Sequence, residues 1–124
     1  MNAARLIPWV VHEAVEYGAV VLLVLAPFLF DFDSDAAKWA SIAIGVAVLV
    51  VGLISRGTLG ATQVLSSSAH ATLDYVTAAV LVLAPFVLGF VDDTSAVTFF
   101  VLLGVAHMAL TLLTRFPAKQ TPQP

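Results

Sequence analysis

The hexapeptide LVLAPF occurs twice in this chain of 124 residues, as residues 23–28 and again as residues 81–86. A histidine precedes each copy by eleven residues, and a carboxylate followed by a tyrosine begins four residues after each histidine. His12 therefore corresponds to His70, and Glu16 corresponds to Asp74, both at a spacing of 58 residues. A repeat of this length indicates that one unit of about half the chain was duplicated, so we expect both halves to share one architecture.

The composition is typical of a protein that lies within a lipid bilayer. Hydrophobic residues make up 60% of the chain and charged residues 10%, and the mean hydropathy is +1.02, whereas soluble domains average about 25% charged residues. Four apolar stretches, near residues 8–30, 37–55, 69–90 and 96–115, are each close to the roughly 20 residues that cross a bilayer as a helix. They are continuous rather than alternating, which favours helices over a membrane barrel. The sequence predicts an all-α membrane protein with four transmembrane helices, arranged as two tandem parallel-repeat hairpins.

The charges predict how these helices are oriented. If the helices alternate in direction, one side of the bilayer receives Arg5, Arg56, Arg115 and Lys119. The positive-inside rule then places both termini in the cytoplasm. We expect a multi-pass protein of the inner (plasma) membrane. Each copy contains two helices, so both copies insert in the same direction and are related by an axis along the membrane normal. We expect a first hairpin in residues 1–56, an inner linker in 57–68, a second hairpin in 69–116 and a disordered tail in 117–124.

The repeated prolines carry a family resemblance. Pro27 and Pro85 each lie about one turn from the outer end of the first helix of a hairpin, where each is predicted to bend the helix. An Ala-Pro-Phe at this place, twice in one chain, resembles the SPW-repeat family of small bacterial membrane proteins, named for Ser-Pro-Trp at the corresponding position. The prolines match, while Ala stands for Ser and Phe for Trp. The resemblance covers residues 12–56 and 70–115, and implies a membrane location with no established chemistry.

Ionisable side chains inside the apolar stretches are the candidate functional residues, because burying them in a bilayer is costly. His12 and Glu16 share one helical face, as do His70 and Asp74, and a histidine can pair with a carboxylate four residues on. The neighbouring Glu13 points about 100° away and is predicted to be solvated at the interface. His107 lies in the fourth stretch at a position where the first copy has Val48, so the duplication is asymmetric there.

Several uses of these residues remain open. The first is structural: His12, Glu16, His70 and Asp74 form polar clamps in a non-catalytic scaffold or accessory subunit, which acts with other membrane subunits or as a homo-oligomer. The second is a cofactor site, either a haem held by His12 and His70, with His107 as a further cofactor-binding candidate, or a metal ion held by His107, Glu16 and Asp74. The third is proton or ion passage through Glu16 and Asp74.

Other function classes find no support in the sequence. The chain has no cysteine, which excludes a disulfide or a thiolate metal site. It has no glycine-rich phosphate loop and no motif for hydrolysis, so we expect no enzyme. The net charge of −3 gives no reason to expect a nucleic-acid partner.

Overall fold

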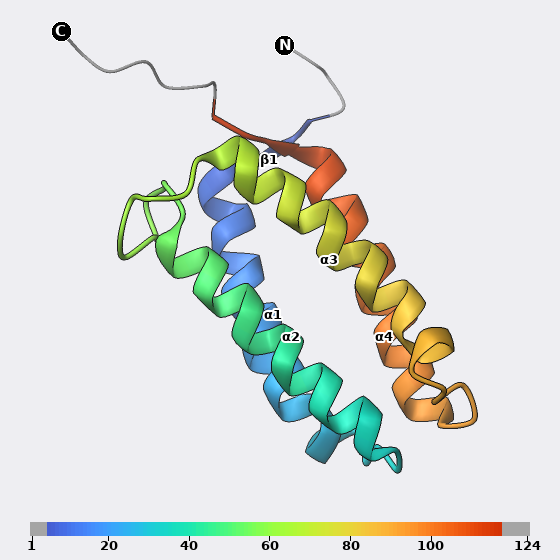
Figure 1. The fold of residues 1–124 in the computed structure, drawn as a ribbon. Helices are drawn as coiled ribbons and strands as arrows, with labels where there is room; N and C mark the ends of the chain where they lie inside the picture. Colours follow the sequence, from blue (N-terminus) through green and yellow to red (C-terminus); the bar gives the residue numbers. More distant parts are fainter. Residues whose placement is uncertain (1–4, 118–124) are drawn as a thin grey trace, which may run out of the picture.

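Four long helices make up most of residues 5–117, the part of the chain that the computed structural model describes (Figure 1). They contain 20 or 21 residues each and are apolar enough to cross a membrane, since 20 residues of helix span about 30 Å. The prediction of an all-α protein with four spans is therefore confirmed. The helices are α1 (Trp9–Leu29), α2 (Asp35–Ile54), α3 (Ser67–Val87) and α4 (Thr94–Leu113).

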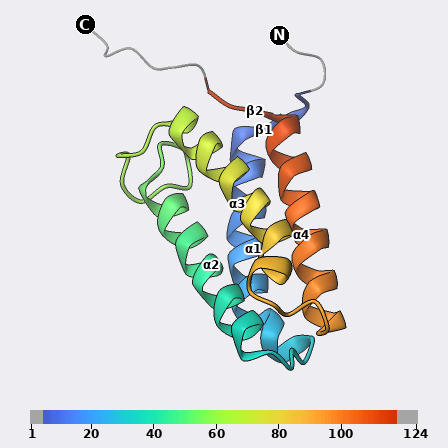
Figure 2. The same cartoon turned by 45° about the vertical axis from the view of Figure 1, so that its right-hand side comes forward.

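The helices form two hairpins, α1 with α2 and α3 with α4 (Figure 1). The two short strands β1 (Ile7–Pro8) and β2 (Thr114–Arg115) form a parallel pair at the end of the bundle where α1 begins and α4 ends (Figure 2). An equivalent parallel bridge joins Ser55, after α2, to Leu65, before α3. Each hairpin thus begins beside the end of the other, which closes the four helices into a ring.

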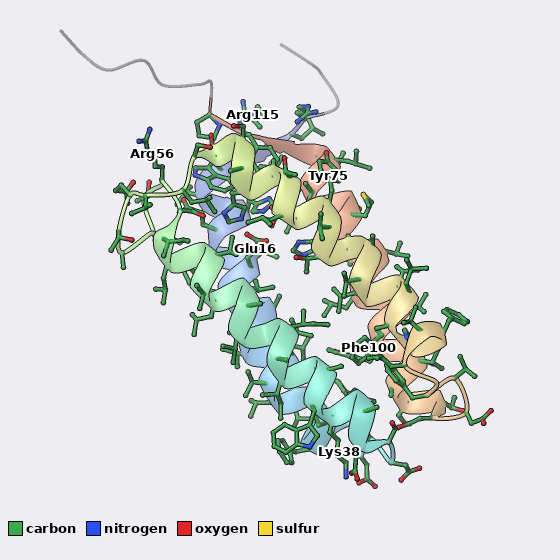
Figure 3. All side chains as sticks on the ribbon, viewed as in Figure 1. Glu16, Lys38, Arg56, Tyr75, Phe100 and Arg115 are labelled. Carbon is green, nitrogen blue, oxygen red and sulfur yellow. The ribbon has the colours of Figure 1, made fainter. Side chains whose placement is uncertain are left out.

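The charged residues separate between the two ends of the bundle as predicted. Arg56 and Arg115 lie at the end of the bundle that holds β1 and β2, and Lys38 lies at the opposite end (Figure 3). We call these the arginine end and the acidic end, because the loops at the second end hold Asp31 and Asp92, among other aspartates. Lys119 and the rest of the predicted tail, residues 118–124, lie outside the described residues. The domain boundaries predicted at residues 56, 68 and 116 remain predictions.

Both helices that contain the repeated hexapeptide continue through their prolines, and the predicted bends remain predictions. Proline has no N–H to donate to the carbonyl four residues earlier, so Pro27 leaves the carbonyl of Leu23 without its helical partner. Ser41 of α2 supplies a replacement, because its Oγ donates to the Leu23 oxygen at 2.6 Å. The corresponding position of α4 is Phe100, which is fully buried in the core.

The apolar core occupies the half of the bundle nearer the acidic end and is nearly symmetric between the copies. Its main members are paired residues of the two repeats: Leu23 with Leu81, Ala26 with Ala84, Phe32 with Phe90, and Ala37 with Ala96, completed by Phe100. Leu23 of α1 also lies against Gly45 of α2, where a Cβ would come within 3.1 Å of the Leu23 Cβ. Gly45 therefore allows α2 to pack closely against α1 within the same hairpin.

Asp93 joins the two hairpins at the acidic end. Its Oδ1 accepts a hydrogen bond from the N–H of Ala96 at 3.2 Å and so caps α4. Its Oδ2 accepts from the N–H groups of Asp33 and Ser34, both at 2.9 Å, in the loop of the other hairpin. With the core fixed at this end, the polar residues of α1 and α3 face one another at the arginine end.

Candidate functional site

Five ionisable side chains meet inside the bundle near the arginine end. His12 and Glu16 come from α1, His70 and Asp74 from α3, and His107 from α4. All five are buried, His12 completely. Glu16 lies between the two hairpins, below the level of Arg56 and Arg115 (Figure 3). The structure therefore brings every polar candidate of the sequence analysis into one group, which we call the central cluster.

The shortest contacts in the central cluster cross between the two repeats. His12 Nε2 lies 2.9 Å from Asp74 Oδ2, and His70 Nε2 lies 2.5 Å from Glu16 Oε1. The predicted pairs within one helix also exist but are longer, 3.1 Å for His12 with Glu16 and 3.3 Å for His70 with Asp74. Each histidine is thus held by the carboxylates of both copies, and the cluster ties α1 to α3.

A hydroxyl group fixes the far ring nitrogen of each of these two histidines. Ser55 Oγ lies 2.6 Å from His70 Nδ1, and Thr114 Oγ1 lies 2.6 Å from His12 Nδ1. Each hydroxyl donates its single proton to a backbone carbonyl four residues earlier, at 2.5 Å for Ser55 and 2.6 Å for Thr114. It must therefore accept a hydrogen bond from the imidazole, which assigns the proton to Nδ1. Both Nε2 atoms consequently face the carboxylates.

His107 completes the central cluster from the side of α4. Its Nε2 lies 3.4 Å from Glu16 Oε2 and 3.5 Å from Asp74 Oδ1. His107 Nε2 and Glu16 Oε2 are both buried without a hydrogen-bond partner among the described residues. A buried polar atom without a partner is costly, and a proton or a cation between these two atoms would satisfy both. Val48 occupies the corresponding position of α2, as the sequence indicates.

Two aromatic rings cover the central cluster at the arginine end. The Trp9 ring lies 5.1 Å from the His12 ring and 4.9 Å from the His70 ring, centroid to centroid. The Phe116 ring lies 5.3 Å from His12 and 5.1 Å from Trp9. Sequence reasoning identified neither these rings nor the two hydroxyls as parts of the site. The only available signal was that Ser55 and Thr114 each lie at the end of the second apolar stretch of a copy.

The expectation for Glu13 is wrong. Its side chain is 4% exposed rather than solvated, because the loop between α2 and α3 folds over it. The N–H of Leu59 donates to Glu13 Oε2 at 3.0 Å, while Glu13 Oε1 has no hydrogen-bond partner within the described chain. The sequence places Glu13 on the correct helix, but it gives no information on where a loop rich in Gly and Ser settles.

The donor set of the central cluster fits a metal ion. His12, Glu16, His70 and Asp74 each offer one ligand atom, and these four atoms lie within 4.8 Å of one another. In a tetrahedral site with metal–ligand bonds of about 2.0–2.1 Å, neighbouring ligand atoms are about 3.3–3.4 Å apart. The Nε2-to-oxygen distances of 2.9–3.5 Å, apart from the shorter contact between His70 and Glu16, lie near this value.

A haem is a poorer match to the same residues. The His12 and His70 rings are 5.8 Å apart in an edge-to-face arrangement, and both Nε2 atoms point at carboxylates rather than at a shared planar slot. Glu16 and Asp74 thus occupy the positions facing the two Nε2 atoms, where a haem iron would have to bind.

Comparison with known proteins identifies the family. No curated protein and no solved structure matches the chain. A family model described as the SPW repeat domain matches residues 8–114, a range that contains all four helices and the whole central cluster. This agrees with the resemblance carried by Pro27 and Pro85, and the chain belongs to the SPW repeat family.

Proposed function

We propose that this small integral membrane protein is a non-catalytic accessory protein built around a closed site for one divalent transition-metal ion. The observation that carries the proposal is the convergence of three histidine Nε2 atoms on two carboxylates inside the membrane-spanning bundle. Ligating histidines almost always donate their other ring N–H to a fixed partner. His12 and His70 both do so, to Thr114 and Ser55.

Each residue of the central cluster has a role in this proposal. His12 and His70 supply Nε2, and Glu16 and Asp74 supply one oxygen each. His107 is a further ligand. An ion bound by its Nε2 would give a partner to this atom and to Glu16 Oε2, both of which otherwise lack one. A nitrogen and oxygen donor set without sulfur suits ions such as Zn²⁺, Fe²⁺ or Mn²⁺. An ion held in this way would lock the two repeats together, because its ligands come from both.

The accessory role is supported by how closed the site is. The cavity beside the central cluster has a volume of about 10 Å³, which is room for about one water molecule. Structural metal sites are closed, whereas catalytic sites keep a position open for water or substrate. The α3–α4 face carries an apolar groove of about 560 Å³ that includes Val82, Gly104 and Val105, a surface on which other membrane subunits or a second copy could pack.

Proton storage is the competing use of the same geometry. Each short contact between Nε2 and a carboxylate oxygen needs one shared proton when no metal is bound, because Nδ1 already carries a proton. Glu16 and Asp74 would then carry protons instead of a metal ion, as proton passage requires. We propose that the protein resides in the inner membrane, which its four apolar helices could span. The positive-inside rule supports an orientation with the arginine end facing the cytoplasm.

A titration with Co²⁺ separates these possibilities. Metal-free protein in mild detergent is titrated with Co²⁺, and the visible ligand-field absorption is recorded. The proposal predicts saturation at about one ion per chain and a loss of the band in the Glu16→Gln/Asp74→Asn variant. The control variant Asp31→Asn/Asp92→Asn removes two carboxylates that are exposed at the acidic end, and it should bind Co²⁺ like the wild type. Absence of the band in the wild type would contradict the proposal and favour protons.

A further inference from the structure

Glu13 occupies a place in the bundle that the proposed metal site leaves unexplained. It is 4% exposed, and its Oε1 is buried without a hydrogen-bond partner in the described part of the chain. A buried carboxylate oxygen in this state is costly. Glu13 and Glu16 are three residues apart on α1 and are therefore neighbours on the helix surface.

The cavity of about 10 Å³ connects Glu13 to the central cluster. Its lining includes Glu13, Glu16 and His70, together with Val48 and Gly52 of α2. The two orphaned carboxylate oxygens, Glu13 Oε1 and Glu16 Oε2, thus belong to residues that line one cavity. Glu16 is a member of the central cluster, whereas Glu13 is not.

The outer side of Glu13 is covered by an exposed loop. Leu59 donates its N–H to Glu13 Oε2 at 3.0 Å and accepts a hydrogen bond from the Tyr17 hydroxyl at 2.8 Å. Gly57 packs so closely that a Cβ there would overlap the Glu13 carboxylate. Hydrogen bonds within the loop stabilise its conformation, because the Gln63 side chain bonds to the backbone of Gly57 and Gly60. Glu13 therefore lies between this loop and the cavity.

The second copy lacks this arrangement at every corresponding position. Ala71 stands where the first copy has Glu13, and on α4 His107 and Thr111 stand where α2 has Val48 and Gly52. The α4 side is filled by a ligand and a threonine, while the α2 side has an apolar residue, a glycine and an additional carboxylate. The two copies therefore differ at these positions, and the additional carboxylate lies on the α2 side of the bundle.

We propose that Glu13 is the access ligand through which a divalent cation passes between the arginine end and the central cluster, along the α2 side. This inference rests on the proposed metal site. The cation is first bound by Glu13 beneath the loop, then by Glu16 Oε2 across the cavity, and finally by the histidines. Glu13 does not hold the ion in its final position, so it controls the rates of exchange and not the affinity.

The test is the exchange kinetics of Co²⁺ in the wild type and in Glu13→Gln, an isosteric change. Stopped-flow mixing of metal-free protein with Co²⁺ gives the association rate, and mixing of loaded protein with excess chelator gives the dissociation rate. We expect both rates to fall by about tenfold, the lower end of the range by which a charged lining raises the association rate of an oppositely charged ligand, with an unchanged Kd. Glu13→Asp, which keeps a carboxylate, should recover most of both rates.

The outcomes separate this inference from the proposed function. Wild-type rates in Glu13→Gln would overturn the access role and leave the metal site intact. A weakened affinity with faster dissociation would also overturn it, since Glu13 would then be a ligand or a structural support of the bound state. A wild-type protein that takes up no Co²⁺ would overturn the proposed function and this inference with it. Asp31→Asn is the control for loss of one negative charge and should exchange Co²⁺ at wild-type rates.

Discussion

Thr114→Val removes one hydroxyl group and tests whether His12 is held as a metal ligand. Thr114 is fully buried, and valine has nearly the same shape, so the change removes hydrogen bonds without opening a cavity. The Thr114 hydroxyl accepts from His12 Nδ1 and donates to the Leu110 carbonyl, both at 2.6 Å. After the substitution the Nδ1–H of His12 has no acceptor in place, and the ring loses the contact that fixes its orientation.

The magnitude follows from two separate considerations that agree. Leaving a buried donor without its partner costs about 1–3 kcal/mol. Removing the group that orients a ligating histidine typically lowers metal affinity by about 10–100-fold, which corresponds to about 1.4–2.8 kcal/mol. We therefore expect Thr114→Val to raise the Kd for Co²⁺ or Zn²⁺ by between one and two orders of magnitude.

Thr111→Val is the matched control. Thr111, in the last turn of α4, is also fully buried, and its hydroxyl also donates to a carbonyl four residues earlier, that of His107, at 2.9 Å. It makes no hydrogen bond to an imidazole nitrogen. Affinity is measured by competition with a chelator of known strength in the same detergent. An unchanged affinity in Thr114→Val, or an equal loss in Thr111→Val, would refute the assignment of His12 as an oriented ligand.

Three further substitutions test other parts of the account. His107→Val gives the second copy the residue that the first copy has at this position. It should weaken metal affinity by about tenfold or more in the same competition assay, and an unchanged affinity would show that His107 is not part of the site. Asp93→Ala removes the cap of α4 and the acceptor for two N–H groups of the other hairpin. It should therefore lower the free energy of unfolding in mixed detergent micelles by about 2–3 kcal/mol. Asp92→Ala, at the exposed neighbouring position, should change the free energy of unfolding little. Gly89→Ala puts a side chain at a φ of 75° and should cost about 1–2 kcal/mol in the same assay, while Gly18→Ala, within a helix and with open space around it, should stabilise by up to about 1 kcal/mol.

Much of the architecture could be predicted because the two halves of the sequence are repeats of one unit. The repeated hexapeptide and four apolar stretches located the helices to within a few residues, since both signals act along one helix at a time. The prediction of paired His12 with Glu16 and His70 with Asp74 was confirmed for the same reason, because residues four apart on a helix are always neighbours.

The remaining features depend on how separate segments pack. The crossed contacts from His12 to Asp74 and from His70 to Glu16 exist only because α1 and α3 face each other, which no local pattern encodes. Ser55 and Thr114 lie just after the ends of α2 and α4, and only the closure of the ring brings them to the histidines. Glu13 was misjudged because its burial depends on the loop above it, and loop paths are set by a few hydrogen bonds such as that from Leu59.

The metal content of the protein isolated from its native membrane tests the central claim most directly. Protein purified in mild detergent without chelator is measured by elemental analysis beside the Glu16→Gln/Asp74→Asn variant. The account predicts about one transition-metal ion per chain in the wild type, either as isolated or once it has been incubated with Zn²⁺. It predicts little or no metal in the variant. A wild-type protein that stays metal-free after incubation, or a variant that retains as much metal as the wild type, would contradict it.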